Sequence, residues 1–492
     1  MTDLARLSAI QLLDGYRRRK FSPADVTEVV IAALRRIQPT LNVLVTDMFD
    51  GAREAALAAS EAWARGEPDG PLCGVPVTVK DLIYLAGVRG CAGSPVLRDF
   101  VPPVDAASVE RLKRAGAVIT GKTTTCEFGY KLTADSPISG ITRNPWNPGR
   151  TSGGSSGGAA AALAAGAGPL ALGTDAVGSI RVPAAFCGVF GLKPTFGLVP
   201  RSPGFSPPSW GSLAHTGPMA RSVADAALLL GVIAGHDARD GASLPVMPQR
   251  YAAPVGRLDG VRIAFSPDWG WAAVDSAVRD AVRLTVERLA DLGAEVTARD
   301  PGVPAEILES TLKPIGYTEQ ATAAGMTRDE AQFALSERDF GAVVSRGRRY
   351  PGVEYMTATH RRAALRESFR KLFTEFDLLV TPAVAVTAFE AGILGADTVD
   401  GKAVDRHLGW SPFSWPINLA GLPAASLPCG VDPAGLPIGL QIVAPWLGEA
   451  SILRAAAAYE AAHPWGQRWP AQGLGNNGAV APKRSATIQP AG

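Results

Sequence analysis

Apolar residues recur at helical spacing through the first 65 residues of the chain. Val26, Val30 and Ala33 lie three or four positions apart, and an alanine-rich run over residues 52–64 continues the pattern. Such spacing gathers apolar side chains on one face of a helix. We therefore predict an N-terminal helical segment over residues 1–65 that packs on the rest of the molecule.

A different period begins after residue 65. Val75, Val77 and Val79 alternate with other residues up to Lys80, which predicts a strand with the valines on one face and Lys80 on the other. Further segments follow in the order helix 106–115, strand 117–120, strand 261–265, helix 278–289 and strand 295–297. Alternation of this kind predicts an α/β fold, a sheet sandwiched by helices.

The remaining segments set the expected domain limits. Residues 66–467 are predicted to form one α/β domain. Residues 300–415 include a polar helical stretch up to about residue 360 and a loop-like stretch with several aromatic residues, Thr398–Trp415. We expect these two stretches to form the outer wall of a substrate cleft. Residues 468–492 are rich in Gly, Pro, Asn and Ser, so we predict a flexible C-terminal tail.

The balance of acidic and basic residues argues against a nucleic-acid partner. The chain of 492 residues holds 48 Lys and Arg against 46 Asp and Glu, a formal net charge of +2, which gives no reason to expect a nucleic-acid partner. No run reaches the roughly 18 apolar residues of a membrane span, and the N-terminus lacks the pattern of a secretory signal. We therefore expect a globular cytoplasmic protein that binds neither nucleic acid nor membranes.

Cysteine and histidine are too scattered for a metal centre. They form no Cys-x-x-Cys pair and no His-Glu-x-x-His motif, so we expect no disulfide framework, no metal and no cofactor. The residues concerned are Cys73, Cys91, Cys126, Cys187 and Cys429, and His215, His236, His360, His407 and His463.

Glycine is concentrated around the densest polar motifs. Residues 139–198 contain 13 glycines in 60 positions, against 54 in 492 overall, which indicates backbone that turns sharply or approaches a ligand closely. The run Thr151-Ser-Gly-Gly-Ser155-Ser-Gly-Gly158 has the composition of a linker, but it leads directly into helix-forming alanines. A second glycine turn carries Ser179, 24 residues after Ser155. Two serines on two tight turns within one packed unit suggest a pair of catalytic loops.

Two other glycine-rich motifs fit less well. Gly153-Gly-Ser155-Ser-Gly157 matches the Gly-x-Ser-x-Gly nucleophile elbow, but that motif follows a strand. Here the preceding residues include Pro145 and Pro148, and proline is excluded from central strands. A phosphate-binding loop would need a following Gly-Lys-Ser/Thr, which is missing here.

At this point the motifs resemble those of the amidase signature family. The resemblance covers residues 74–441 and is carried by Lys80 in Gly-Val-Pro-Val-Thr-Val-Lys-Asp-Leu, by Ser155 in Gly-Gly-Ser-Ser-Gly-Gly, and by Ser179 in Gly-Thr-Asp-Ala-Val-Gly-Ser-Ile-Arg-Val-Pro-Ala. Further matching segments are Gly121–Phe128, Thr142–Trp146, Gly217–Asp225, Phe376–Pro382, Gly421–Ser426 and Gly439–Gln441. The resemblance implies the fold of that family, a large mixed β-sheet core between helices.

The resemblance also implies a Ser-Ser-Lys triad without histidine. In this scheme Ser179 attacks the carbonyl carbon, Ser155 relays its proton, and Lys80 is the final base. The resemblance also implies that the peptide bond before Ser155 is cis. Ser156 is the nearest competitor for the relay, but the family pattern places that role on the first serine. A lysine acts as a base only when neutral. At about pH 8 this requires the pKa to fall by about 2.4 from its ordinary value of about 10.4, which costs about 3.3 kcal/mol.

Residues around Ser179 are expected to support it. The backbone amides of Ala176, Val177, Gly178 and Ser179 are expected to form an oxyanion hole for the tetrahedral intermediate. Asp175 and Arg181 are expected to hold this loop through charge-assisted hydrogen bonds.

The expected reaction is hydrolysis of a carbonyl–nitrogen bond, with some ester cleavage, through an acyl-enzyme on Ser179. The substrate is expected to be a small aryl or hydrophobic amide, or a carbamate, because the resemblance extends to aryl acylamidases and urethanases. The alternative is the glutaminase subunit of a tRNA-dependent amidotransferase, but Val182 stands where that subunit commonly has Gln. We expect a monomer or homodimer. An inactive binding or scaffold protein is the alternative from another class, and the complete triad disfavours it. Several aromatic residues lie in segments that the family uses near the cleft, where core packing is a commoner role for each of them than substrate recognition. They are Phe205, Trp210, Trp269, Trp271, Trp410, Phe413 and Trp415.

Overall fold

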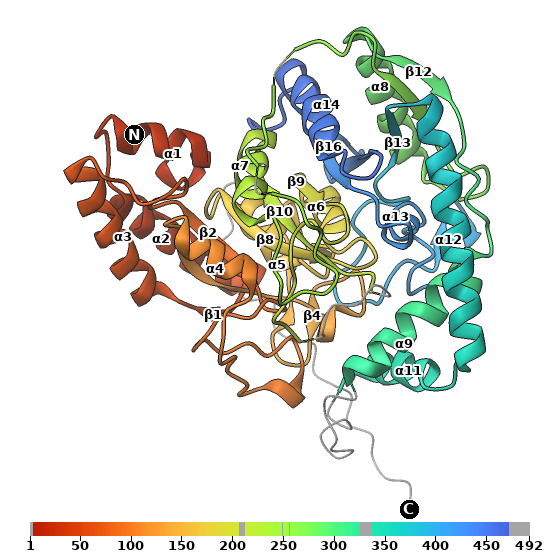
Figure 1. Cartoon of the computed structure of the whole chain (residues 1–492), viewed down its shortest axis with the longest axis horizontal. Coiled ribbons are helices and arrows are strands. Elements are labelled where there is room, and N and C mark those ends of the chain that lie inside the picture. The colour runs from red at the N-terminus through yellow and green to blue at the C-terminus, as the bar shows by residue number, and fades with distance from the viewer. Residues whose placement is uncertain (1–2, 206–211, 248, 255, 325–335, 472–492) are drawn as a thin grey trace, which may run out of the picture.

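A mixed β-sheet runs through the centre of the molecule (Figure 1). The structure is a computed structural model and describes residues 3–205, 212–247, 249–254, 256–324 and 336–471. Within these residues the sheet has eleven strands. In order across the sheet they are β1 (Leu44–Asp47), β3 (Val118–Thr123), β2 (Pro76–Lys80), β8 (Leu170–Asp175), β10 (His215–Ala220), β9 (Phe190–Lys193), β16 (Ala424–Val431), β17 (Pro437–Val443), β13 (Leu378–Pro382), β11 (Arg262–Phe265) and β12 (Glu295–Ala298).

The sheet combines parallel and antiparallel pairs. β2 pairs in parallel with both β3 and β8, and β11 pairs in parallel with β12 and β13. The central strands β10, β9, β16 and β17 are antiparallel. Three short hairpins lie outside the sheet: β4 (Asp135–Ser136) with β5 (Gly140–Ile141), β6 (Arg143–Asn144) with β7 (Asn147–Thr151), and β14 (Thr398–Val399) with β15 (Lys402–Ala403). This architecture confirms the predicted α/β class and the large mixed sheet.

Helices surround the sheet. In chain order they are α1 (Ala9–Arg17), α2 (Pro23–Leu41), α3 (Phe49–Arg65), α4 (Ala107–Arg114), α5 (Gly157–Ala164), α6 (Arg181–Cys187), α7 (Val223–Ile233), α8 (Ser276–Asp291), α9 (Lys313–Ala324), α11 (Arg338–Gly347), α12 (Gly352–Glu375), α13 (Trp415–Ala420) and α14 (Glu449–Ala462). Figure 1 shows α1–α3 at one end of the molecule, and α8 and α12 at the other.

The N-terminal helices are fixed by their caps and by one buried carboxylate. α2 begins with a capping box between Ser22 and Asp25 and ends at Asn42, whose φ of 54° is left-handed. The first two amides of α1 donate to Asp225 at 2.9 and 3.1 Å. Asp225 lies in the first turn of α7, so this contact ties the N-terminal helices to the α/β body.

Most of the predicted elements lie where the sequence pattern placed them. The predicted strand ending at Lys80 is β2, and the predicted helix and strands over residues 261–297 are β11, α8 and β12. Residues 1–65 also contain a strand that the pattern did not predict, β1, which pairs with the edge of β3. The prediction of helices alone in this segment is therefore incomplete.

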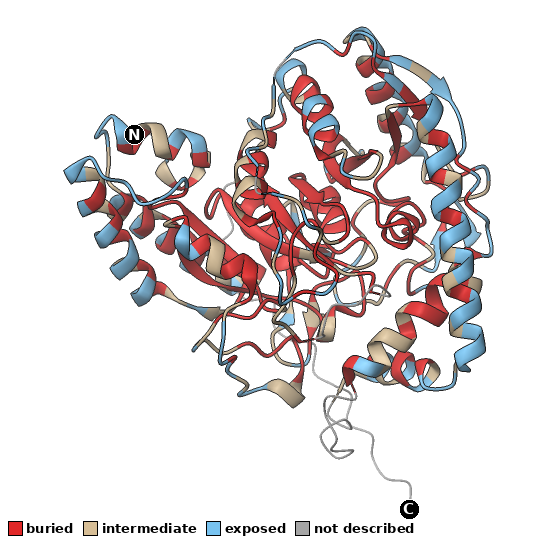
Figure 2. Ribbon diagram, in the orientation of Figure 1, coloured by how far each residue is buried: buried red, intermediate tan, exposed pale blue. Residues whose placement is uncertain are grey.

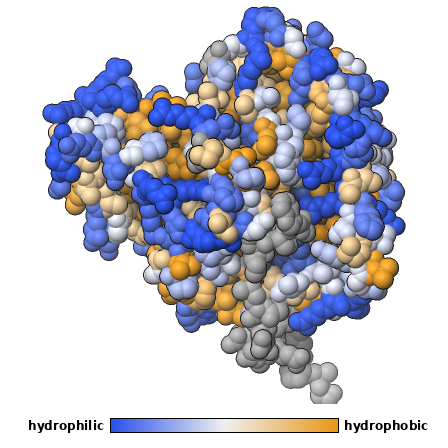
Figure 3. Space-filling model, viewed as in Figure 1, coloured by the Kyte–Doolittle hydropathy of each residue, from blue (hydrophilic) through white to orange (hydrophobic). Residues whose placement is uncertain are grey.

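Burial follows the layered arrangement. Figure 2 shows the central strands of the sheet together with α5 and α6 as almost wholly buried, whereas α3 and α12 alternate between buried and exposed residues. The edge strands β1 and β12 are mostly not buried. The face drawn in Figure 3 is largely hydrophilic at its outer edges, with hydrophobic residues toward its centre. The strands that carry the candidate residues thus lie in a desolvated interior.

Candidate active site

The carboxyl ends of two neighbouring parallel strands form the base of the candidate site. β2 ends at Lys80 and β8 ends at Asp175, and ligands of α/β proteins commonly bind beside this edge of a sheet. Ser155 lies two residues before α5, and Ser179 lies two residues before α6. The backbone N–H of Ser156 donates to the carbonyl of Ser179 at 3.1 Å. The two serine loops therefore meet directly above the strand ends.

The glycines of the first loop allow this close approach. A Cβ atom on Gly154 would lie 2.2 Å from the carbonyl of Thr133, and one on Gly158 would lie 2.3 Å from Thr124 Oγ1. Atoms at such distances overlap, so a larger side chain would push the loop away from its support. The peptide bond between Gly154 and Ser155 is cis. Gly154 and Gly158 therefore serve close packing against Thr133 and Thr124, whereas the sequence pattern predicts sharp turns or close approach to a ligand.

Lys80 is completely buried. Its Nζ lies 2.8 Å from Ser155 Oγ, 2.9 Å from Ser156 Oγ and 2.9 Å from Thr174 Oγ1. Desolvation by burial lowers the pKa of Lys80 from 10.5 to about 7, because an ammonium ion loses its hydration there. A substantial fraction of the amine is therefore neutral at neutral pH.

The hydrogen bonds distinguish Ser155 from Ser156. The hydroxyl of Ser156 donates to the Thr174 carbonyl at 3.1 Å and accepts from the Thr174 N–H at 3.2 Å. Its proton is therefore engaged, so that Ser156 meets Lys80 as an acceptor. Ser155 is bound to Lys80 and also lines the cavity described below. This geometry makes Ser155 the better candidate for a proton relay.

Ser179 also lines that cavity, with only 2% of its surface exposed. Its Oγ atom has no hydrogen-bond partner among the described residues. Ser155 and Ser179 thus share one cavity without being hydrogen-bonded in this structure. Catalytic hydrogen bonds are often long in unliganded enzymes and shorten in the substrate complex.

The loop expected to form the oxyanion hole, residues 176–179, is hydrogen-bonded to the side chain of Asp175. The N–H of Gly178 donates to Asp175 Oδ1 at 2.8 Å, which removes this amide from the set expected to face an oxyanion. The amides of Ala176, Val177 and Ser179 remain candidates. Gly178 has a φ of +128°, and a Cβ there would lie 2.6 Å from Ser414 Oγ, so this turn favours glycine.

Asp175 and Arg181 form a buried ion pair under the loop. Arg181 donates from Nε to Asp175 Oδ2 and from Nη2 to Oδ1, both at 3.0 Å. Asn418 donates to Asp175 Oδ1 at 2.9 Å, and Gln441 accepts from Arg181 at 2.6 Å. Arg181 holds the pKa of Asp175 well below its ordinary value despite burial. These paired contacts fix the backbone on both sides of Ser179.

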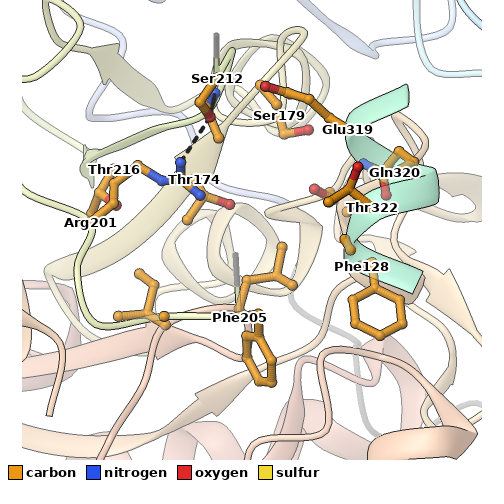
Figure 4. A pocket seen from close by; sticks show the side chains of 18 of the residues that line it. Phe128, Thr174, Ser179, Arg201, Phe205, Ser212, Thr216, Glu319, Gln320 and Thr322 are labelled. Atoms are coloured by element: carbon orange, nitrogen blue, oxygen red, sulfur yellow. Dashed lines mark hydrogen bonds between the residues drawn. The ribbon is translucent and has the colours of Figure 1, made fainter. Parts of the chain in front are cut away.

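The two serines open into a cavity of about 440 Å³. Figure 4 shows residues of α9 on one side of it, Arg201 on the other, and Phe128 and Phe205 below. The lining residues are Leu82, Ile83, Ala106, Ser108, Phe128, Gly129, Ser155, Thr174, Ala176, Ser179, Arg201, Pro203, Gly204, Phe205, Ser212, Ala214, Thr216, Thr318, Glu319, Gln320, Thr322, Ala323 and Tyr355. A cavity of this size suits a small organic molecule.

The lining differs from the aromatic set expected from the sequence. Phe205 does line the cavity, and Trp210 lies outside the described residues. The remaining five belong instead to the hydrophobic core or pack against it: Trp269, Trp271, Trp410, Phe413 and Trp415. Of the two stretches expected as the outer wall, the first contributes α9 residues and Tyr355, whereas no residue of Thr398–Trp415 is among the described lining residues.

Sequence reasoning missed several residues of the site. Thr174 directly precedes the expected Asp175, and its hydroxyl contacts Lys80; its position within the family motif could have suggested it. Phe128, Arg201 and Glu319 line the cavity from three separate segments. No local pattern marks them, because only the tertiary fold brings these segments together.

The described residues also bear on cysteine pairing, metal sites and membrane spans. The five cysteines are free and buried. The described part of the chain contains no group of three or more His, Cys, Asp or Glu side chains suited to a metal ion. None of its helices is long and apolar enough to cross a membrane.

A family model and individual sequence relatives assign the chain to the same family. A family model described as Amidase matches residues 25–453. The chain is 37% identical over 477 residues to a glutamyl-tRNA(Gln) amidotransferase subunit of Thermosynechococcus vestitus, covering 92% of this chain and 97% of that protein. It is 34% identical over 475 residues to an acylamidase of Rhodococcus erythropolis, covering 95% and 98%.

A solved structure agrees with these sequence matches. A bacterial aryl acylamidase of the amidase signature family superposes with a TM-score of 0.88 at 29% identity, covering 94% of this chain and 97% of that chain. Since the family model spans most of the chain and the relatives align over nearly their whole length, the chain belongs to the amidase signature family of carbon–nitrogen hydrolases.

Proposed function

We propose that this chain hydrolyses a carbonyl–nitrogen bond through an acyl-enzyme on Ser179, with Ser155 as proton relay and Lys80 as base. The observation that carries the proposal is the buried Lys80 amine, which lies 2.8 Å from Ser155 Oγ and has a pKa of about 7. A serine hydroxyl is a weak nucleophile unless a neighbouring base accepts its proton. Lys80 has the position and the neutral fraction to act as that base.

The proposed reaction has two halves. Ser179 Oγ forms a bond to the carbonyl carbon while its proton passes to Ser155 and the Ser155 proton passes to neutral Lys80. The same path in reverse protonates the nitrogen, which leaves as an amine or ammonia. Water then attacks the acyl-enzyme by the same proton path and releases the acid. The amides of Ala176, Val177 and Ser179 would stabilise the oxyanion in both halves.

The cavity supports a small, partly apolar substrate. Leu82, Phe128 and Phe205 provide apolar surface, and α9 contributes polar groups to the lining. The likeness to an aryl acylamidase structure favours an aryl amide. Carbamates belong to the proposal as well, because the same acyl transfer applies to their carbonyl–nitrogen bond. Esters should also be cleaved, since an alkoxide leaves more easily than an amine.

A second candidate function is the release of ammonia from glutamine within a tRNA-dependent amidotransferase. It is favoured by sequence identity, which is 37% to the amidotransferase protein of Thermosynechococcus vestitus and 34% to the acylamidase. This activity would use the same Ser179 acyl-enzyme, but it would require partner subunits. The two candidates therefore differ in substrate and in partner dependence.

The test is to assay the purified chain alone on a panel of aryl amides, aryl carbamates and glutamine. The proposal predicts hydrolysis of an aryl amide or carbamate, with a loss of at least about 10³-fold in Ser179→Ala. Ser155→Ala should lose about 10²- to 10⁴-fold. Ser156→Ala is the matched control and should lose less than Ser155→Ala. If glutamine is the one substrate of the panel that is hydrolysed, and if this requires added partner subunits, the result favours the second candidate.

A further inference from the structure

Two opposite charges line the substrate cavity away from the catalytic lysine. Among the described lining residues, the charged side chains are Arg201 and Glu319. Glu319 belongs to α9, whereas Arg201 comes from the segment before Phe205. Figure 4 shows the two side chains entering the cavity from different sides, with Glu319 drawn beside Ser179.

Both side chains are anchored to the same short segment. Arg201 Nη1 donates to Ser212 Oγ at 3.1 Å. The carboxylate of Glu319 accepts a hydrogen bond from the backbone of Leu213, the next residue. Each of the two side chains also shifts the pKa of the other electrostatically, so both act on the same cavity.

Nevertheless, the two charges do not pair. Among the described residues, neither Arg201 nor Glu319 forms a salt bridge, although Asp240 acts electrostatically on Arg201 and Arg362 acts on Glu319. Both are partly buried, and the resulting desolvation lowers the pKa of Arg201 and raises that of Glu319 to about 7. Partial burial of charged groups that lack a close ion-pair partner costs free energy, and a polar ligand group would offset this cost.

Neighbouring polar atoms also lack partners. Thr318 Oγ1 and Gln320 Oε1 are buried and have no hydrogen-bond partner in the described part of the chain. Both residues flank Glu319 on α9 and line the cavity. This wall thus offers several unsatisfied polar groups to a ligand in the cavity.

We propose that Arg201 and Glu319 form a specificity subsite for a second polar group of the substrate, one that offers an acceptor to Arg201 and an N–H donor to Glu319. A carboxamide is the simplest such group. An amine alone would leave Arg201 unpaired, and a carboxylate alone would leave Glu319 unpaired. The preferred substrates are therefore amides that carry a second amide-type group on the acyl side, and this rests on the proposed acyl transfer at Ser179.

The test uses a series of substrates that differ in the length of their acyl chain. Acyl p-nitroanilides of increasing chain length are compared in pairs that end either in a carboxamide or in an isopropyl group of similar shape. A hydrogen bond to a charged group contributes about 1.5–3 kcal/mol. At the length that reaches the subsite, the carboxamide substrate should therefore have a kcat/KM about 10- to 100-fold higher than its isopropyl partner.

Two substitutions locate the effect. Glu319→Gln and Arg201→Gln should each reduce this carboxamide preference at least about fivefold. Glu309→Gln is the matched control, because Glu309 pairs with Lys313 and Arg346 outside the cavity, and it should keep the preference. Circular dichroism and thermal unfolding verify that each variant is folded. No carboxamide preference at any chain length, or an equal preference in Glu319→Gln, would overturn the subsite.

Failure of the subsite can be separated from failure of the proposed reaction. If isopropyl substrates are cleaved in a Ser179-dependent manner without a carboxamide preference, the reaction stands and the subsite is wrong. If no anilide is cleaved, calorimetric binding of adipamide and glutaramide to the intact wild-type chain tests the subsite alone. Binding weakened at least about fivefold by Glu319→Gln supports it, and no binding, or equal binding, contradicts it.

Discussion

Replacing Thr174 by Val should change the pH at which the enzyme gains activity. Three hydroxyl oxygens lie within 2.9 Å of Lys80 Nζ, and one of them is Thr174 Oγ1. Each can accept a hydrogen bond from the ammonium form and so favours protonation. Valine has a similar shape but no acceptor. Thr174→Val should therefore lower the pKa of Lys80 below its wild-type value of about 7.

The size of the change follows from one lost acceptor. A hydrogen bond to a charged group contributes about 1.5–3 kcal/mol, and about 1.4 kcal/mol corresponds to a pKa change of 1. Allowing for rearrangement of the two remaining hydroxyls, we expect the apparent pKa to fall by about 1. At about pH 6 the neutral fraction of Lys80 would rise from about one tenth to about one half.

The assay is the pH profile of kcat/KM on an aryl amide or ester between about pH 5 and 9. Because Lys80 acts as a base, activity should rise with pH and level off above its pKa. In wild type the value at pH 6 should be about a tenth of the plateau, and in Thr174→Val about a half. Thr216→Val is the control, since Thr216 lines the same cavity beside Thr174 on the paired strand but has no hydrogen bond to Lys80 in the structure. An unchanged or higher midpoint in Thr174→Val would refute the reasoning.

Two further predictions concern the support of the loops. Asp175→Asn removes one partner of a fully buried ion pair and should cost about 3–5 kcal/mol in the free energy of unfolding measured with urea; Asp377→Asn, in an exposed pair, should cost less than about 1 kcal/mol. Equal effects would contradict the role of burial. Gly158→Ala places a Cβ 2.3 Å from Thr124 Oγ1 and should cost about 1–3 kcal/mol. Gly51→Ala, with nothing within 4 Å, should instead gain about 0.5–1 kcal/mol because alanine favours the helix, and thermal unfolding distinguishes the two.

Predicted helices such as α8 are those whose burial is one-sided and periodic. α8 buries Val278, Val282 and Leu289 on one face, and this repeat is visible in the chain itself. β1 was missed because only its first residue, Leu44, is buried, so no period of two is expressed. That strand depends on pairing with β3, a contact that local sequence does not encode.

The candidate site was predictable to a similar extent. Lys80, Ser155 and Ser179 were found because their motifs resemble a known family, and the structure places Lys80 beside Ser155. The hydrogen bond from Gly178 to Asp175 was not predictable, since it depends on how tightly the loop turns. Trp410 and Trp415 lie in segments that the family resemblance places near the cleft, and a packing role is the commoner one for such aromatic residues; the structure places both in the hydrophobic core.

The most direct test of the central claim is to find the residue that becomes acylated. The intact protein is treated with an aryl carbamate that acylates serine hydrolases, and the adduct is located by peptide mass spectrometry. Our account predicts one carbamoyl group on Ser179, formed much more slowly in Lys80→Ala and absent in Ser179→Ala. A stable adduct on Ser155, Ser156 or another residue, with Ser179 unmodified, would contradict it.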